Sequence, residues 1–250
     1  MMHKLTGGLW GQEAQPALRR IAGLLPLMLL CWLPLIGAIA LLLPFLDRPV
    51  AELPERVAAK LGYLQPTWII VRTLVVAGLF LLIWRTYDRS RRASVLGLIG
   101  YMIGLTVFTT DWMQALDPSY YSTIYPVEVA GAQILGAFAL VVLLVPVDAK
   151  GDFGKILLAA LLSWAYFAAM QWLISWMGDL PDEAEWYLRR LNGVWPVPLV
   201  LMLGLFAVVP FFALLPQRVR GSLPNLRIVA GIILVGYAAE SLWRIGPAHG

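Results

Sequence analysis

Seven long apolar runs constrain what this chain can fold into more than any other feature. They lie at residues 21–46, 68–84, 93–110, 127–147, 156–177, 197–215 and 226–245. A helix needs about 20 apolar residues to cross the hydrocarbon core of a bilayer, and each run is close to that length. Charged residues make up only 14% of the chain, whereas a soluble domain carries about a quarter. The sequence therefore predicts an all-α, polytopic transmembrane helix bundle of about seven spans, with residues 1–250 forming a single integral membrane domain.

The first run differs from the others because Pro26, Pro34 and Pro44 interrupt it. Proline removes a backbone hydrogen bond and clashes with the preceding turn, so we expect this helix to kink or tilt. Ala38-Ile39-Ala40 has the small-residue pattern of a signal-peptidase site. Because apolar residues continue to Leu46, we expect an uncleaved helix instead.

The basic residues predict how the spans are oriented. Cytoplasmic segments of membrane proteins carry an excess of Lys and Arg. If the N-terminus is cytoplasmic, twelve basic residues fall on that side and six on the other. The inside set is Lys4, Arg19, Arg20, Arg85, Arg89, Arg91, Arg92, Lys150, Lys155, Arg218, Arg220 and Arg227, and the outside set is Arg48, Arg56, Lys60, Arg189, Arg190 and Arg244. We therefore expect a cytoplasmic N-terminus and an outer C-terminus, with Arg72 of the second run extending outward to the interface.

The segment between the third and fourth runs combines acids and aromatic rings without any basic residue. Its acids are Asp111, Asp117 and Glu128, and its tryptophan and tyrosines are Trp112, Tyr120, Tyr121 and Tyr125. Carboxylates near lipid are costly and usually functional. The predicted orientation places this segment on the outer side. Asp111, Asp117 and Glu128 are therefore candidates for proton transfer, with solvated or helix-capping acids as the alternative.

The residue types that hold redox metals are scarce. The only histidines, His3 and His249, lie in the two tails, whereas a membrane-embedded haem needs axial ligands within helices. Cys31 is the only cysteine, and no C-x-x-C-H or nucleotide-binding motif occurs. We expect no haem, iron–sulfur cluster or other metal held by the chain's own ligands. The net charge of +4 lies in short loops, so the expected contacts are lipid and protein and not nucleic acid.

Polar residues inside two of the runs have two interpretations each. Glu128 begins the fourth run, where it partners the helix dipole or is a protonatable group near a quinone head. Trp164, Gln171 and Ser175 share one face of the fifth run. They either bond to neighbouring helices or line a ligand site.

Two further spacings predict helix contacts. Glu240 and Arg244 are four residues apart, which is the spacing of an ion pair on a helix. Gly100 and Gly104 form a G-x-x-x-G motif, which lets another helix approach closely. Both are interpreted as structural features.

Four stretches, taken in order, resemble a known family. The first holds Asp111-Trp112-Met113, Leu116-Asp117-Pro118 and Tyr121-Ser122-Thr123-Ile124. The others are Gly154-Lys155-Ile156-Leu157 leading to Trp164-Ala165-Tyr166 and Gln171, then Trp186-Tyr187-Leu188-Arg189-Arg190 with Gly193-Val194-Trp195, and the closing helix up to Pro247. Over residues 70–247 they are similar to the smaller polysulfide-reductase-like membrane subunit of alternative complex III, a quinol:cytochrome c oxidoreductase. Members of that family are substantially longer, so this chain resembles a shortened form.

The resemblance implies a cofactor-free, multi-pass subunit of a respiratory quinol-oxidising electron-transfer complex in a bacterial inner membrane. Such a subunit carries no redox centre, packs beside membrane and periplasmic cytochrome and iron–sulfur subunits, and contributes to a quinone pocket or to proton movement on the periplasmic side. By position, Asp111, Asp117, Glu128 and Gln171 are the residues carried over from the family. The candidate quinone-proximal residues are Trp112, Tyr121, Gln133, Trp164, Tyr166 and Gln171.

Two other classes of protein stay open. A scaffold or assembly subunit without quinone chemistry predicts acids that are merely solvated at the interface. A small transporter predicts paired broken helices and a charged site at mid-membrane. Pro34 and Pro210 are compatible with broken helices, but no charge lies at the centre of a predicted span.

Overall fold

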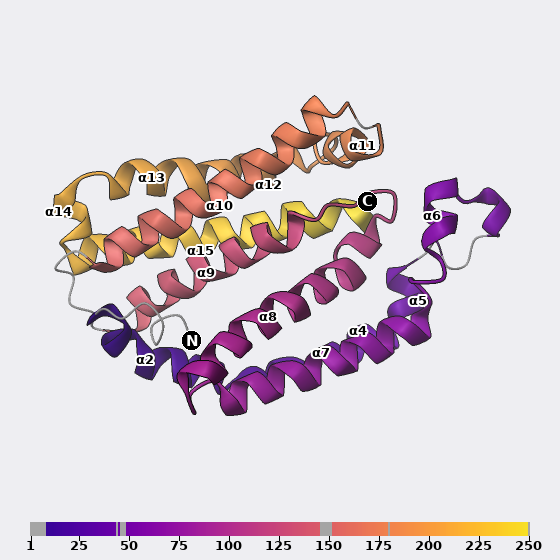
Figure 1. Ribbon diagram of the computed structural model, residues 1–250. Helices are drawn as coiled ribbons and strands as arrows, with labels where there is room; N and C mark the ends of the chain where they lie inside the picture. The colour runs from indigo at the N-terminus through magenta and orange to yellow at the C-terminus, as the bar shows by residue number, and fades with distance from the viewer. Residues whose placement is uncertain (1–8, 44, 46–48, 146–151, 180, 250) are drawn as a thin grey trace. The chain divides into compact units, whose positions relative to one another are not determined.

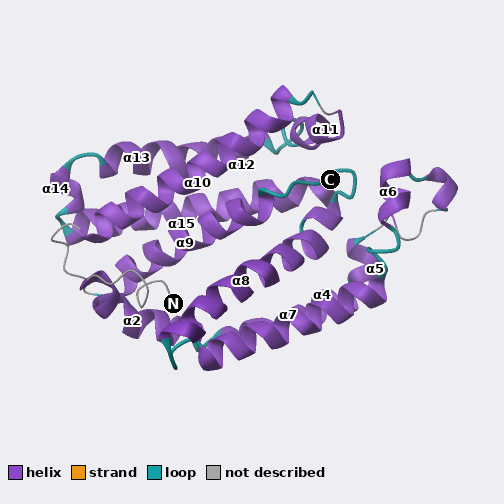
Figure 2. Ribbon diagram, in the orientation of Figure 1, coloured by secondary structure: helices purple, strands orange, loops and turns teal. Residues whose placement is uncertain are grey.

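The computed structural model describes residues 9–43, 45, 49–145, 152–179 and 181–249. This part of the chain is helical almost throughout and contains no strand (Figure 2). Seven of its helical segments are long and apolar enough to cross a membrane: Glu13–Gly37, Pro66–Thr86, Arg91–Leu116, Tyr125–Leu144, Asp152–Met177, Pro196–Leu214 and Leu223–Ile245. The prediction of an all-α, multi-pass bundle is therefore confirmed.

Five of these segments each contain one long helix, with bounds close to the predicted runs (Figure 1). They are α7 (Pro66–Thr86), α8 (Arg91–Trp112), α9 (Tyr125–Leu144), α10 (Asp152–Met177) and α15 (Leu223–Ile245). Pro66, Pro126 and Pro224 lie in the first turns of α7, α9 and α15, where a missing N–H costs no helical bond. Ser90 caps α8, since its hydroxyl oxygen accepts from the Ala93 N–H at 3.0 Å.

The first run differs from its prediction. Instead of one helix over residues 21–46, the chain forms α2 (Leu9–Ala22), α3 (Leu25–Leu30), α4 (Trp32–Gly37) and α5 (Ile39–Leu42). The segment long enough to span, Glu13–Gly37, therefore begins and ends earlier than expected. Pro26 lies in the first turn of α3 and Pro34 lies within α4, and neither has an N–H to continue the helix before it. Pro44 and Leu46 lie outside the described residues, as do His3, Lys4, Arg48 and Lys150.

The chain divides into two compact units. Unit 1 comprises the described residues of Arg19–Tyr121, and unit 2 those of Gly8–Leu18 and Ser122–Gly250. In unit 1, α7 and α8 pack along each other after a turn at residues 87–90. A Cβ atom added at Gly104 would lie 2.6 Å from Phe80 Cε1, and one at Gly100 would lie 3.3 Å from Ile83 Cδ1. Gly100 and Gly104 therefore face α7, and the space that they leave is filled by side chains of that helix.

In unit 2, α9 packs against both α10 and α15. A second neighbour of α15 is a composite helix of α12 (Pro196–Leu201), a π-helical segment η4 (Met202–Val208) and α13 (Val209–Leu214). Pro210 has no N–H for the Phe206 carbonyl four residues earlier, so α-helical bonding is interrupted where η4 meets α13. Gly236 of α15 lies directly against this segment, because a Cβ atom there would be 2.5 Å from the Phe206 nitrogen.

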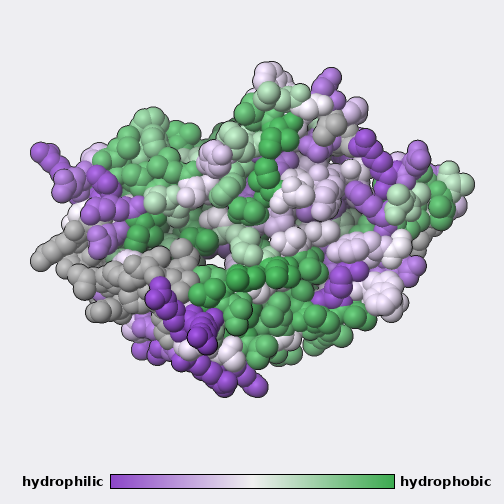
Figure 3. Space-filling model, in the orientation of Figure 1, coloured by the Kyte–Doolittle hydropathy of each residue, from purple (hydrophilic) through white to green (hydrophobic). Residues whose placement is uncertain are grey.

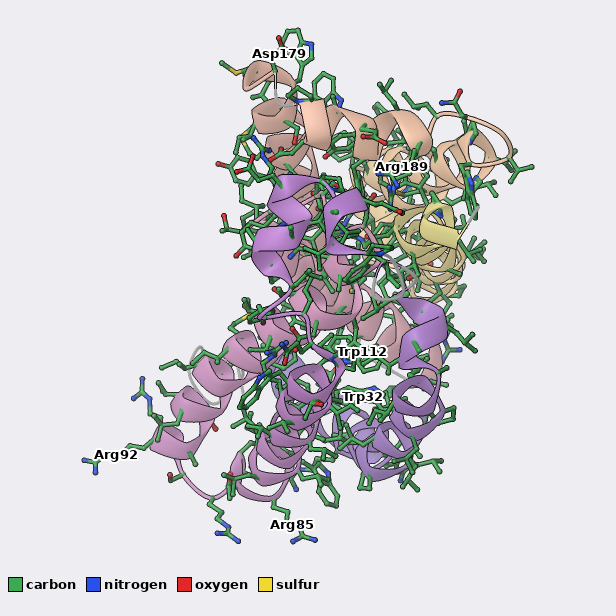
Figure 4. All side chains as sticks on the ribbon, turned by 90° about the vertical axis from the view of Figure 1, so that its right-hand side faces the viewer. Trp32, Arg85, Arg92, Trp112, Asp179 and Arg189 are labelled. Atoms are coloured by element: carbon green, nitrogen blue, oxygen red, sulfur yellow. The ribbon has the colours of Figure 1, made fainter. Side chains whose placement is uncertain are left out.

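Apolar side chains cover the flanks of the helices. On the face drawn in Figure 3, hydrophobic residues lie along the helices and hydrophilic ones gather toward helix ends and connecting segments. On α7 and α8 the exposed apolar residues include Leu74, Val75, Leu82, Leu96, Ile99 and Ile103. Arg85 and Arg92 project away from the ribbon at the α7–α8 turn, at the opposite end of α8 from Trp112 (Figure 4). This distribution is typical of helices that face lipid between two polar boundaries.

Candidate functional site

Asp111, near the end of α8, is buried in an ion pair with Arg72 of α7. Arg72 Nε donates to Asp111 Oδ2 at 2.7 Å, and Arg72 Nη2 donates to Oδ1 at 3.1 Å. The Asp111 side chain is 1% exposed, and that of Arg72 is 22% exposed. This two-point contact ties the first part of α7 to the end of α8 and compensates a carboxylate that would be costly to bury alone.

Tyr63, in the loop between α6 (Glu55–Lys60) and α7, completes this group. Its ring centroid is 3.8 Å from the Arg72 guanidinium carbon, and its carbonyl oxygen accepts from Arg72 Nη2 at 2.8 Å. Burial, followed by the charge of Asp111 and a hydrogen bond to it, raises the pKa of Tyr63 to about 12. Tyr63 therefore keeps its phenol proton at neutral pH and shares it with the carboxylate.

A pocket of about 390 Å³ lies beside Tyr63 at this end of unit 1. Pockets that bind small molecules have volumes of about 300–1,000 Å³, so a single ring system fits here. Lys60 donates to the Pro118 carbonyl at 2.7 Å, and its Nζ lies 5.6 Å from the centroid of the Tyr121 ring. The polar and aromatic lining residues include Lys60, Tyr63, Thr106, Thr110, Gln114 and Tyr121.

Asp117 and Trp112 shape the surroundings of this pocket without lining it. Asp117 is 3% exposed and follows the short helix η3 (Gln114–Leu116), and its carbonyl oxygen accepts from the Tyr120 N–H at 2.9 Å. Trp112 Nε1 donates to Thr73 Oγ1 at 2.8 Å, which is a second polar contact between α8 and α7. Both residues therefore fix the loop and the helix pair that surround the pocket.

Glu128, in the first turn of α9, belongs to a second buried group, in unit 2. Arg244 Nη2 donates to Glu128 Oε1 at 2.9 Å, and Arg244 Nε donates to Glu240 Oε1 at 2.8 Å. Arg244 Nη2 also contacts Glu240 Oε1. The guanidinium carbon lies 4.8 Å from the centroid of the Tyr125 ring. Two buried carboxylates therefore share one guanidinium where α9 meets α15.

Arg190 is a buried residue of this region, which the sequence analysis named as a loop charge and as part of a family-like stretch without giving it a role. Its side chain lies over the Trp186 ring, with the guanidinium carbon 3.5 Å from the centroid. Arg190 Nη2 donates to the Arg244 carbonyl at 2.8 Å, which joins the segment after α11 (Pro181–Arg189) to the end of α15. The four-residue spacing of Trp186 and Arg190 is the one sequence signal that points to this stacking.

A third polar group joins α10 to its neighbours in unit 2. Ser122 donates to Gln171 Oε1, and Gln171 Nε2 donates to Ser175 Oγ at 3.3 Å. Ser175 Oγ lies 2.5 Å from Glu183 Oε2 on α11 and donates to it. Trp164, Gln171 and Ser175, which were predicted to share one face of this helix, are all buried.

Two expectations about the acids are corrected. The segment of residues 111–128 has no basic residue of its own, but the fold supplies Arg72 to Asp111 and Arg244 to Glu128. Arg72 therefore does not extend freely to the interface. The solvated alternative also fails, because Asp111, Asp117 and Glu128 are only 1%, 3% and 7% exposed. Asp111 and Asp117 belong to unit 1, and Glu128 belongs to unit 2.

The six candidate quinone-proximal residues fall at different places. Tyr121 lines the pocket of unit 1, and Trp112 bonds to Thr73 beside it. The other four belong to unit 2: Gln133 on α9 is half-buried, Trp164 and Gln171 are buried on α10, and Tyr166 is exposed on α10. Of the six, Tyr121 lines the pocket beside Tyr63, and the other five are not among its lining residues.

Comparison with known protein families and with curated proteins gives no match to this chain.

Proposed function

We propose that this chain is a cofactor-free membrane subunit of a respiratory quinol-oxidising complex, and that its unit 1 forms a quinol-binding site. In this proposal the chain lies in a bacterial inner membrane with its N-terminus in the cytoplasm. Its partner subunits hold the haem and iron–sulfur centres. Its support from the sequence is the resemblance over residues 70–247 and the bias of basic residues toward one set of loops.

The observation that supports it best is the pocket beside Tyr63 and Asp111. A quinol is a flat ring with two hydroxyl groups, and the pocket offers the rings of Tyr63 and Tyr121 together with a few polar groups. Tyr63 contacts both the pocket and the Asp111 carboxylate. If a quinol hydroxyl forms a hydrogen bond with the Tyr63 oxygen, only the Tyr63 phenol group separates it from the buried Asp111 carboxylate, which is a proton acceptor.

The chemistry assigned to this site is proton acceptance. A quinol that is oxidised gives up its electron pair and its two hydroxyl protons. The electron pair passes to the metal centres of the partner subunits. Each hydroxyl proton in turn passes to the Tyr63 oxygen while the Tyr63 proton passes to Asp111, and Asp111 releases the first proton before it accepts the second. The phenol is therefore neutral before and after each transfer. Release of the second proton from Asp111 to water restores the ion pair with Arg72 and resets the site.

The test is quinol-dependent cytochrome reduction by the intact complex carrying Tyr63→Phe. Loss of a positioned proton-transfer group typically lowers the rate about 10²-fold or more, and we expect turnover to fall by at least that factor. Tyr87→Phe, at the other end of α7, is the matched control and should turn over at the parent rate. Subunit content is measured in parallel. Equal turnover for the two variants would exclude the proton-accepting role of Tyr63.

An assembly subunit without quinone chemistry is the second candidate. It is favoured by one observation, the pairing of both Asp111 and Glu128 with arginines, which is what structural ion pairs require. This candidate predicts that Glu128→Gln lowers the amount of assembled complex. It also predicts that turnover per assembled complex stays unchanged in both Glu128→Gln and Tyr63→Phe.

A further inference from the structure

Basic residues from three helices lie at the end of unit 2 where α10 and α15 begin. Arg218 and Arg220 belong to the short helix α14 (Gln217–Arg220), Arg227 to the second turn of α15, and Lys155 to the first turn of α10. α14 contacts both α10 and α15. Hydrophilic side chains gather over α14 at the left of Figure 3. The fold therefore brings these basic residues together, although they span more than 70 positions of the sequence.

Arg220 lies directly against the start of α10 because residue 154 is a glycine. A Cβ atom added at Gly154 would lie 2.7 Å from Arg220 Cβ and 2.9 Å from Arg220 Cα, so a larger residue there would displace α14. Arg220 Nη2 donates to the Leu215 carbonyl at 3.4 Å, which is a long hydrogen bond to an uncharged acceptor. The position of Arg220 is therefore fixed by backbone packing, while its charge is not neutralised by this contact.

Arg227 lies at the end of α9, and it too bonds only to uncharged acceptors. Its Nε donates to the Val142 carbonyl at 3.4 Å, and its Nη2 donates to the Val145 carbonyl at 3.5 Å. Asp152, the acid at the start of α10, pairs instead with Lys155 at 3.5 Å. Among the residues that the structure describes, Arg218, Arg220 and Arg227 form no ion pair. This end of unit 2 therefore presents three guanidinium groups without a carboxylate partner.

Exposed apolar side chains adjoin these arginines. Leu215, whose carbonyl accepts from Arg220, is exposed, and so is Ile228, the neighbour of Arg227. Phe212, three residues before Leu215, is 62% exposed on α13. Phe212 and Ile228 belong to two of the membrane-spanning segments, so their side chains face the hydrocarbon region. The arginines therefore lie at the boundary between a polar helix end and the apolar flank of the bundle.

We propose that Arg218, Arg220 and Arg227 bind the phosphate group of an anionic phospholipid, whose acyl chains lie along the exposed apolar residues beside them. A guanidinium group donates paired N–H bonds to phosphate oxygens, and basic sites between membrane helices bind anionic headgroups. A free phosphate matches the arginines but not the apolar flank. A zwitterionic phospholipid matches the apolar flank but carries a cation of its own. An anionic phospholipid therefore matches both parts of this surface.

The test is lipid binding by the purified full chain, and it does not depend on the proposed function. The chain in a neutral detergent is titrated with phosphatidylglycerol, and native mass spectrometry measures the lipid that it retains. Phosphatidylcholine with the same acyl chains tests the apolar contacts without a net negative charge, and inorganic phosphate tests the anion alone. We expect phosphatidylglycerol to bind at least about tenfold more tightly than phosphatidylcholine. Inorganic phosphate at the concentration of the lipid should not displace it.

Each arginine near an anionic lipid strengthens its binding about fivefold, so the double variant Arg220→Gln, Arg227→Gln should bind phosphatidylglycerol about 30-fold more weakly. The matched control is the double variant Arg85→Gln, Arg92→Gln. It removes the same charge from exposed arginines beside the α7–α8 turn and should bind like the parent. Arg218→Gln changes only an exposed side chain, so it should fold, and it should bind about fivefold more weakly than the parent.

Three results would overturn the proposed site. Equal phosphatidylglycerol affinities of the two double variants would mean that any basic residue of the chain attracts this lipid. Equal affinities of the parent for phosphatidylglycerol and phosphatidylcholine would mean that the arginines do not select an anion. Displacement of phosphatidylglycerol by inorganic phosphate at the concentration of the lipid would mean that the apolar flank contributes nothing and that the site binds free anions.

Discussion

Arg244 of α15 donates to Glu128 of α9 at 2.9 Å, although the two residues are 116 positions apart in the sequence. The same guanidinium bonds to Glu240, so one cation compensates two buried carboxylates. The contact joins the first turn of α9 to the last turn of α15. The packing of α9 against α15 in unit 2 therefore depends on this charge group.

Removing the shared cation should be far more destabilising than removing an exposed one. Arg244→Gln leaves two buried carboxylates without a partner, which typically costs about 3–5 kcal/mol of unfolding free energy. Arg189→Gln breaks a pair whose side chains are 40% and 61% exposed, and this should cost about 0–1 kcal/mol. Denaturant unfolding in mild detergent measures both. Similar costs for the two variants would contradict the structural role of Arg244.

Gly236 and Gly231 lie on the same helix, α15, but in different surroundings. A Cβ atom at Gly236 would lie 2.5 Å from the Phe206 backbone nitrogen, whereas one at Gly231 would meet nothing within 4 Å. Gly236→Ala should therefore destabilise unit 2 by about 1–3 kcal/mol through overpacking. Gly231→Ala should be neutral or stabilising by up to about 1 kcal/mol, because alanine favours helix. Thermal unfolding of the two variants separates these outcomes, and a Gly236→Ala protein as stable as Gly231→Ala would refute the close packing.

The raised pKa of Tyr63 predicts a specific pH dependence. Burial and Asp111 raise it from 10.0 to about 12, so the folded chain binds this proton more tightly than the unfolded chain does. The resulting stabilisation is complete below about pH 10 and is lost as the pH rises toward 12. Asp111→Asn removes the negative charge and leaves that of Arg72, so it should lower the pKa of Tyr63. Ultraviolet titration of tyrosinate, with Tyr63→Phe as the difference reference, follows this one phenol. If Tyr63 titrates at its ordinary pKa in the parent, its contact with Asp111 is wrong.

The orientation of the chain is tested by cysteine labelling in intact cells. Cys31 is replaced first because it is exposed. With a cytoplasmic N-terminus, an impermeant reagent should label a cysteine introduced by Ser119→Cys and miss one introduced by Ser90→Cys, since the two serines lie at opposite ends of α8. The reverse pattern would invert the proposed topology.

Local patterns predicted much of the fold. The apolar runs located six of the seven spans, the spacing of Glu240 and Arg244 predicted their pair, and Gly100 and Gly104 predicted the face of α8 that packs against another helix. These features depend on residues that are near in sequence or on a single helix. The first span was predicted to begin and end later in the sequence than it does. The prolines divide this run into short helices, and a hydropathy pattern does not show where those helices end.

The candidate site was predicted only in part, for a physical reason. Asp111 and Glu128 were singled out from the sequence and both are buried, but their partners Arg72 and Arg244 lie 39 and 116 positions away. Such pairs form only when helices pack, so charge counting along one segment missed them. The pocket beside Tyr63 likewise gathers residues from α6, α8 and the loops around them.

The most direct test of the central claim is purification of the tagged chain from its native membrane, followed by quinol-dependent cytochrome reduction by whatever copurifies. We predict a multi-subunit complex that contains haem and iron–sulfur proteins and oxidises quinol. A chain that purifies alone, or with partners that do not oxidise quinol, would contradict the account.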